Sequence, residues 1–277
     1  MNNLYRKGIK LLLTLLLVLP VENSIAENDL EFGSVAMDIP AVMHKRLYPL
    51  TQYLSDVMKR KVTLKLSPNM GAAIKEVATG GVEIAYLTPV AYLKAHEQGD
   101  AKLVAKTVTN GRASFQLMIV VREDSSIHNV QDLVGKSFAF GDKRALLQRA
   151  AVAEAGLSMT QFSEHKFLGH YDNIARAVAS GEFTAGILKD TMAYKWELKG
   201  LRILHKSPAL PPYNISVSKH VDDKTADELR AAFLALDKNN AQHLKIIKAL
   251  DKKYDGFAAT DDSEYEVVRQ MIKPFLK

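Results

Sequence analysis

The chain has 277 residues and no cysteine. This absence excludes disulfides, thiolate metal sites and thiol nucleophiles, and also the acylated cysteine of a lipoprotein. Zinc-finger spacing is impossible for the same reason, and no basic stripe interleaved with aromatic residues is present. We therefore expect neither a metal site nor a nucleic-acid partner.

Long apolar runs are also scarce, and the most apolar one lies at the start of the chain. Three basic residues precede an apolar run at 11–19, and Ser24 and Ala26 place small residues at the two positions read during leader cleavage. The run is shorter than the roughly 18–20 residues that a spanning helix needs. We predict a signal peptide over 1–26, cleaved after Ala26, and a periplasmic protein; an uncleaved anchor is the alternative.

Motifs of the common enzyme classes are missing as well. The sequence contains no Gly-x-Ser-x-Gly elbow, Walker loop, dinucleotide-type glycine fingerprint or His-Glu-x-x-His motif. Its histidines form no close metal-ligand pair, and acidic pairs such as Asp261-Asp262 lie near predicted helix starts, where they suit capping. We expect a protein without catalytic activity and without a cofactor.

The charge that is present is weakly basic. The formal net charge is +6, and removal of the predicted leader lowers it to +4. This excess is diffuse and suits small anionic molecules.

The remainder of the chain alternates short apolar strands with helical segments. Such alternation is typical of βαβ units, so we expect an α/β fold with largely parallel sheets. The predicted strands are 31–35, 62–66, one ending at 87, 115–122, one between Lys136 and the turn at 141–142, 166–168, one within 183–190, one within 201–207 and one within 209–219. The predicted helices are 43–58, 71–78, one opening at 88–89, 146–155, 174–179, 225–237, 241–250 and 263–272.

The order of these elements predicts two lobes. Strands at 115–122 and 213–219 bracket a block with its own βα alternation, so the chain leaves one lobe and later returns to it. We place lobe 1 at 27–115 and 211–277, and lobe 2 at 116–210, with a cleft between them.

The stretch FAFGDKRALLQRAAV, residues 138–152, runs from a strand through a charged turn into a helix. The first N–H groups of a helix are unpaired donors with partial positive charge, and Arg144 adds a guanidinium fork that suits an oxyanion. Alternatively, Asp142 caps the helix, and Lys143 and Arg144 point to solvent.

Other polar residues lie where α/β sheets and hinges place their ligands. Asp38 follows the first strand at its carboxyl end, and both Asp38 and Asp172 suit an amino group of a ligand, or alternatively a turn or cap. Gln116 and Tyr213 lie at the two predicted crossings between lobes, where hinge and ligand contacts are both reasonable.

Several stretches, taken in order, resemble a known family. They are FGSVAMDIP, YPLTQYLSD, GGVEIAYLTPVAYLKA, VVREDSSIHNVQDLVGKSFAFGD, FLGHYDNIARAVASGE and DDSEYEVVRQM. Together they resemble the PhnD-like periplasmic substrate-binding proteins, which serve ABC importers of phosphonate, phosphite and phosphate. The resemblance covers nearly the whole mature chain. It implies the two-lobed type II binding-protein fold with two hinge strands, closure on a ligand, and a membrane permease as partner.

The resemblance also implies roles for individual residues. The helix start at Thr88 is expected to face the cleft, with Thr88 offering its hydroxyl and Tyr92 its ring and phenol; a simple N-cap and a packed tyrosine are the alternative. His170 and Tyr171 lie in the stretch that resembles the family's binding loop.

At three places the sequence departs from the family pattern. The Ser/Thr-rich triplet expected after Phe-Gly-Asp reads Lys143-Arg144-Ala145 and is followed by leucine. The expected Ser-His pair reads His170-Tyr171, and the acidic residue of the next strand reads Thr184. The ligand therefore stays open within the class of small polar, anionic molecules.

We predict a monomeric, exported solute-binding protein for an ABC importer. The alternative is a sensor module of the same fold, which would dock on a membrane histidine kinase or cyclase when its ligand is bound.

Overall fold

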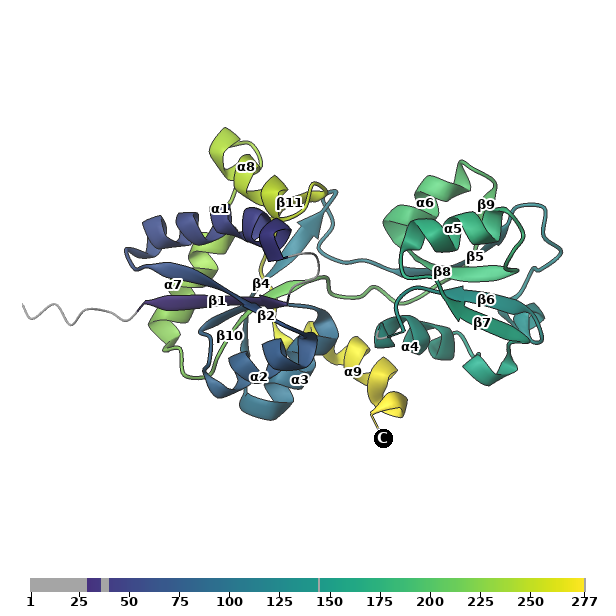
Figure 1. Cartoon of the computed structure of the whole chain (residues 1–277), viewed down its shortest axis with the longest axis horizontal. Coiled ribbons are helices and arrows are strands. Elements are labelled where there is room, and N and C mark those ends of the chain that lie inside the picture. Colours follow the sequence, from purple (N-terminus) through teal and green to yellow (C-terminus); the bar gives the residue numbers. More distant parts are fainter. Residues whose placement is uncertain (1–28, 36–39, 144, 277) are drawn as a thin grey trace, which may run out of the picture.

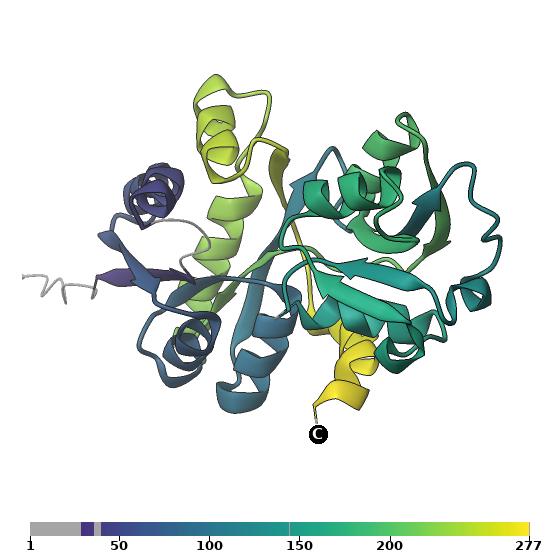
Figure 2. The same cartoon turned by 45° about the vertical axis from the view of Figure 1, so that its right-hand side comes forward.

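A computed structural model describes residues 29–35, 40–143 and 145–276. These residues form two α/β lobes that lie side by side and are joined by extended segments (Figure 1). Figure 2 shows the same two lobes after a turn of 45°. The predicted signal peptide and its cleavage point lie outside the described residues. Among the residues that are described, no helix has both the length and the apolar character needed to span a bilayer.

The first lobe is built on a mixed sheet with the strand order β11-β4-β10-β3-β1-β2. Its strands are β1 (Leu30–Val35), β2 (Val62–Ser67), β3 (Ile84–Leu87), β4 (Lys102–Thr109), β10 (Asn214–Val217) and β11 (Tyr254–Ala258). Strand β1 pairs in parallel with β2 and β3, whereas β10 runs antiparallel between β3 and β4.

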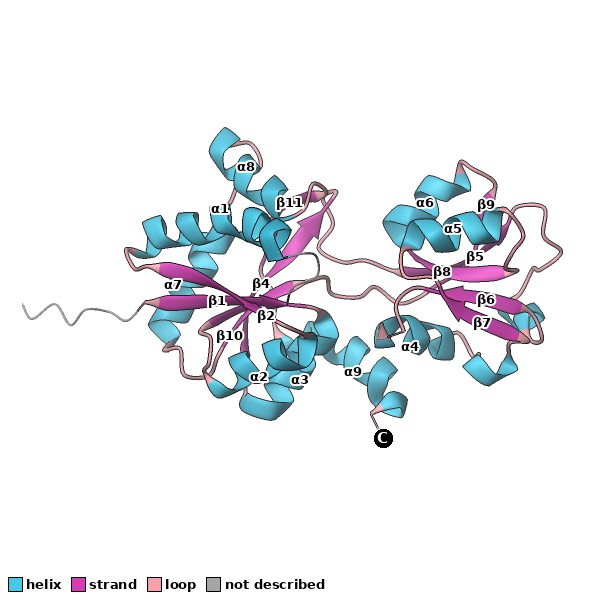
Figure 3. Cartoon of the chain, viewed as in Figure 1, coloured by secondary structure: helices cyan, strands magenta, loops and turns pink. Residues whose placement is uncertain are grey.

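Helices cover both faces of this sheet (Figure 3). They are α1 (Pro40–Met58), α7 (Asp223–Leu234) and α8 (Ala241–Leu250) on one face, and α2 (Met70–Thr79) and α3 (Pro89–Gly99) on the other. Alternate residues of β3 point to opposite faces, as the pleat requires. Ile84 and Tyr86 join the core under α1, whereas Ala85 and Leu87 join the core under α2 and α3.

The second lobe has a smaller sheet with the order β7-β6-β8-β5-β9. Its strands are β5 (Leu117–Arg122), β6 (Ser137–Phe140), β7 (Glu164–Phe167), β8 (Ala185–Lys189) and β9 (Leu201–Lys206). Helix α4 (Leu146–Glu154) covers one face, and α5 (Tyr171–Ala179) and α6 (Asp190–Glu197) cover the other.

The α/β architecture confirms the predicted fold class, but the expectation of largely parallel sheets was wrong. Strand β5 runs antiparallel to β8 and β9, as β10 does to its neighbours. The physical reason is that β5 and β10 are the strands by which the chain enters each lobe from the other. Strands β4 and β11 and helix α6 were not predicted.

The two segments that cross between the lobes pair with each other at the hinge. The Phe115 amide donates to the Leu210 carbonyl at 2.9 Å, and the Leu210 amide donates to the Phe115 carbonyl at 2.8 Å. This antiparallel bridge fixes the two hinge strands side by side.

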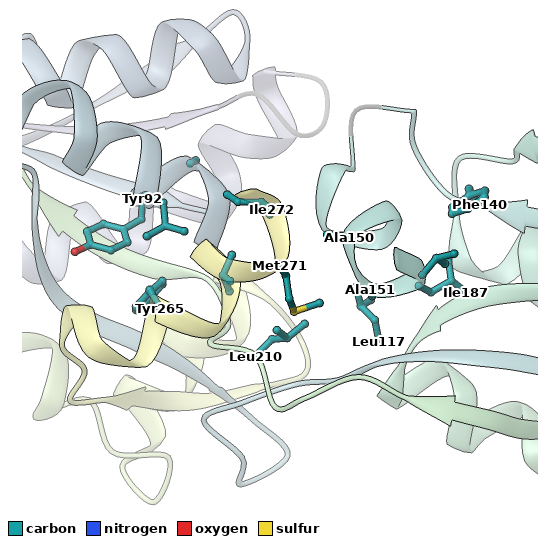
Figure 4. Packing of buried hydrophobic residues seen from close by; sticks show 14 of the residues in the cluster. Tyr92, Leu117, Phe140, Ala150, Ala151, Ile187, Leu210, Tyr265, Met271 and Ile272 are labelled. Carbon is teal, nitrogen blue, oxygen red and sulfur yellow. The ribbon is translucent and has the colours of Figure 1, made fainter. Parts of the chain in front are cut away.

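The C-terminal segment forms a further contact between the lobes. A 3-10 turn, η3 (Asp262–Tyr265), leads into α9 (Glu266–Ile272), which packs on α3 of the first lobe and on α4 of the second. Figure 4 shows Met271 and Ile272 of α9 between Tyr92 on one side and the α4 alanines on the other. The apolar core is therefore continuous from one lobe to the other.

Candidate functional site

Lys189 ends strand β8 at the hinge. Its Nζ lies 4.7 Å from the centroid of the Phe115 ring, and Phe115 is the residue that pairs the two hinge strands. A cation held over an aromatic face is attracted by the negative face of the ring. The Lys189 side chain is half-buried. Because Lys189 is the last residue of its strand, its positive charge lies at the carboxyl end of the sheet, where α/β proteins hold ligands.

The ammonium of Lys189 has no close counter-ion among the described residues. The neighbouring carboxylate, Asp190, is buried and accepts hydrogen bonds from the Thr191 amide at 2.6 Å and the Gln116 amide at 3.3 Å. Burial lowers the pKa of Lys189, and the charge of Lys253 lowers it further, whereas Asp190 and Asp251 raise it. Asp251 and Lys253 belong to the first lobe, so charges of that lobe affect the pKa of Lys189 in the second lobe.

The first lobe holds a group of tyrosines, of which Tyr213 lies directly before β10 in the segment that returns from the second lobe. The Tyr213 ring stacks on Tyr86 with centroids 5.1 Å apart, and the Tyr86 and Tyr254 hydroxyls lie 2.6 Å apart. Burial raises the pKa of Tyr213, and the charge of Asp251 raises it further. Tyr213 is therefore neutral at ordinary pH.

The second lobe contributes Tyr171, at the first position of α5. Burial raises the pKa of Tyr171 to about 12, the neighbouring Gln148 amide opposes this rise, and the charges of Tyr213 and Asp190 add to it. Tyr171 is therefore within electrostatic range of Tyr213 and Asp190. Gln148 also accepts a hydrogen bond from the Gly141 amide at 2.8 Å, which fixes the start of the turn after β6.

Tyr171, Tyr213 and Gln116 are thus the predicted site residues that the structure brings to the hinge region. The Gln116 side-chain amide donates to the Ser207 carbonyl at 2.6 Å, so it ties the two crossing segments together.

Thr88 and Tyr92 lie at the start of α3. The Thr88 hydroxyl accepts from the Ala91 amide at 3.2 Å and caps the helix. Tyr92 is 1% exposed, its hydroxyl donates to Asp262 at 2.7 Å, and its ring packs edge-on against Tyr265. Burial is the main reason that the pKa of Tyr92 is raised, with Asp262 adding to it. Their ligand-binding roles stay predictions.

The other predicted residues are scattered. His170 is exposed at the N-cap of α5, and Asp172 forms an ion pair with Lys195 at 3.9 Å on the surface. Asp38 and Arg144 lie outside the described residues, so the proposed anion site at Arg144 stays a prediction. The N-cap of α4 is Ala145, whose amide donates to the Asp142 carbonyl at 2.9 Å, and the alternative of a capping Asp142 side chain stays a prediction.

Lys189, Asp190 and Asp251 were missed in the sequence. A signal existed, because Lys189 ends a buried strand and Asp190 follows it, at the edge where ligands bind in α/β sheets. Residues 183–190 were predicted to form a strand and a turn, so the start of α6 was not predicted.

Comparison with known proteins identifies the family of this chain. Residues 32–265 match the family described as "ABC transporter, phosphonate, periplasmic substrate-binding protein". The chain belongs to this family. Its members are binding proteins of the periplasm that work with membrane permeases.

Individual relatives agree with this assignment. The phosphonates-binding periplasmic protein of Escherichia coli K12 is 24% identical, over 92% of this chain and 79% of that protein. Among solved structures, XAC2383 of Xanthomonas citri bound to ATP is 17% identical with a TM-score of 0.74, covering 91% of this chain and 100% of the other. PhnD1 of Prochlorococcus marinus in complex with methylphosphonate is 18% identical with a TM-score of 0.69, covering 90% and 98%. The fold is that of type II periplasmic binding proteins.

Proposed function

We propose that this protein is exported to the periplasm, captures a small oxyanion between its lobes and presents it to the permease of an ABC importer. The observation that carries the proposal is the half-buried Lys189 at the hinge, which has no close counter-ion among the described residues. A positive charge kept from water without a partner is costly, so such a charge is typical of a binding site.

The lobes would supply opposite walls. Lys189 and Tyr171 come from the second lobe, whereas Tyr213 follows the return crossing and stacks on the first lobe. Closure about the bridge between Phe115 and Leu210 would bring these walls together over the ligand and expel water. Removal of water strengthens the attraction between Lys189 and an anion.

Binding without chemical change is the role that the family supports. Cleavage of the leader after Ala26, the monomeric state and the absence of catalysis are parts of this proposal. The alternative in which the closed form signals to a membrane kinase or cyclase stays a prediction.

A thermal-shift screen tests the proposal. Phosphate, phosphite, methylphosphonate, aminoethylphosphonate, sulfate and dicarboxylates would each be added to the purified mature protein. A ligand at 100 times its Kd stabilises the folded state by about 2.7 kcal/mol, so a true ligand raises the Tm clearly. The proposal predicts that at least one of these oxyanions does so. If none raises the Tm at millimolar concentration, the proposal is wrong.

A further inference from the structure

Tyr194 of α6 contacts two cations that come from different lobes. The guanidinium of Arg112, which follows β4 of the first lobe, lies 5.9 Å from the centroid of the Tyr194 ring. The ammonium of Lys206, at the end of β9 in the second lobe, lies 5.3 Å from the same centroid. We propose that Arg112 is a positioning residue, which holds the ligand-free lobes in the arrangement seen here through its contact with Tyr194.

Arg112 is fixed on the first lobe by a tight turn. Asn110 and Gly111 have φ of 50° and 73°, and positive values at both central residues are typical of the type I′ turn of a β-hairpin. The Thr109 amide donates to the Arg112 carbonyl at 2.8 Å, and the Arg112 amide donates to the Thr109 carbonyl at 3.0 Å. The Gly111 amide also donates to the Asp255 carboxylate of β11 at 2.7 Å. The backbone of Arg112 therefore moves with the sheet of the first lobe.

Tyr194 is fixed on the second lobe. Its ring packs against the core that α5 and α6 form with the second sheet, and Lys206 Nζ donates to its hydroxyl at 3.4 Å. Lys206 and Tyr194 therefore stay together when the lobes move, because both belong to the second lobe. Of the two cation contacts, the one with Arg112 depends on how the lobes are placed.

The contact of Arg112 with Tyr194 joins the lobes at a place that α9 does not reach. Helix α9 packs on α4, which covers the opposite face of the second sheet from α6 (Figure 1). Among the described residues, the Arg112 guanidinium forms no ion pair, and a cation is attracted to the negative face of an aromatic ring without one. Arg112 is exposed, so its contact is weak, but a weak contact suffices to shift the populations of two lobe arrangements.

The distance between spin labels on the two lobes tests the inference in the ligand-free protein. The chain has no cysteine, so Lys75→Cys in α2 and Lys136→Cys before β6 give one labelling site in each lobe, both at exposed positions. Arg112→Met removes the cation and keeps an unbranched side chain. In this variant the population with the wild-type distance is expected to fall, relative to other arrangements, by about twofold to fivefold. Arg112→Lys keeps a cation and is expected to show a smaller change.

Lys206→Met is the matched control, because Lys206 contacts the same ring from within the second lobe. Its distance distribution is expected to match that of the wild type. Since Arg112 is exposed, Arg112→Met is expected to fold and to melt as the wild type does. An unchanged distance distribution in Arg112→Met, or an equal change in Lys206→Met, overturns the inference. Because no ligand is added, neither result depends on the proposed function.

Discussion

The Lys189 ammonium and the Phe115 ring lie in contact at the hinge, with Nζ 4.7 Å from the ring centroid. Phe115 also forms the bridge with Leu210 that joins the two crossing segments. Phe115 therefore contacts Lys189, the proposed ligand-binding residue, and also holds the two crossing segments together. This arrangement leads to predictions about affinity, pH and stability.

Replacement of Phe115 by leucine removes the aromatic face but keeps an apolar side chain. A cation over an aromatic ring contributes about 0.5–2 kcal/mol, so the affinity of the protein for its oxyanion should fall by about twofold to thirtyfold. Isothermal titration measures this change. Phe275→Leu is the control, because that ring lies near Arg149 of α4 rather than near Lys189, and wild-type affinity is expected. An equal loss in both variants would contradict the account.

Alkaline pH should weaken anion binding through Lys189. Burial lowers the pKa of Lys189 below its ordinary value of 10.5, so the folded protein loses this proton at a lower pH than the unfolded chain does. Between those two pKa values the unfolded chain binds more protons, and the contribution of this group to the free energy of unfolding rises with pH. Over the same window the affinity for an anion falls. Tyr171 stays protonated there, because its pKa is about 12.

The measurement is the affinity for the ligand as pH rises from neutrality toward 10.5, the ordinary lysine value. Lys189→Arg is the control, since arginine stays charged throughout and reports any titration of the ligand itself. A loss of affinity that is the same in the wild type and in Lys189→Arg would show that Lys189 is not the titrating group.

Tyr92→Phe removes one hydrogen bond that holds the C-terminal segment on the first lobe. The Tyr92 hydroxyl donates to Asp262 at 2.7 Å, and Asp262 also pairs with Arg269 at 3.0 Å. A hydrogen bond to a charged group contributes about 1.5–3 kcal/mol, so the free energy of unfolding should fall by about that amount. Urea denaturation measures it. Tyr48→Phe is the control, because Tyr48 is 47% exposed, and no change is expected.

Met271→Ala creates a cavity in the apolar core between the lobes. Met271 is 8% exposed, and α9 packs on helices of both lobes. Such a truncation costs about 2–5 kcal/mol. Because the core is continuous, the wild type should unfold in one calorimetric transition, and the variant should melt at a lower temperature. Leu276→Ala, at a position that is 49% exposed, should cost little. Two separate transitions in the wild type would argue against a shared core.

The sequence allowed the fold to be predicted where its signals were local. In α1, apolar residues recur at spacings of three and four. At the start of α3, Thr88 is an N-cap residue and Pro89 occupies the first helical position. Strand β11 lacked such a signal, because it contains a glycine and polar residues and gains its place by pairing with β4 and packing against α7 and α8.

The candidate site was less predictable because its contacts are not local. The Tyr92 hydroxyl donates a hydrogen bond to Asp262, which lies 170 positions away in the sequence. Lys189 contacts the Phe115 ring, and its pKa is affected by the charge of Asp251, although all three residues come from distant segments. No periodicity or spacing near Lys189 carries that information. The family resemblance predicted a binding role for the turn after β6, where the hydroxyl residues are replaced, and predicted none for Lys189 at the end of β8.

The position of a bound oxyanion tests the central claim most directly. A crystal structure of the mature protein grown with methylphosphonate measures it. The account predicts density for the ligand between the lobes, with a phosphonate oxygen within hydrogen-bond distance of Lys189 Nζ and with Tyr171 and Tyr213 lining the enclosed site. Ligand density elsewhere on the protein, or between the lobes but out of reach of Lys189, would contradict it.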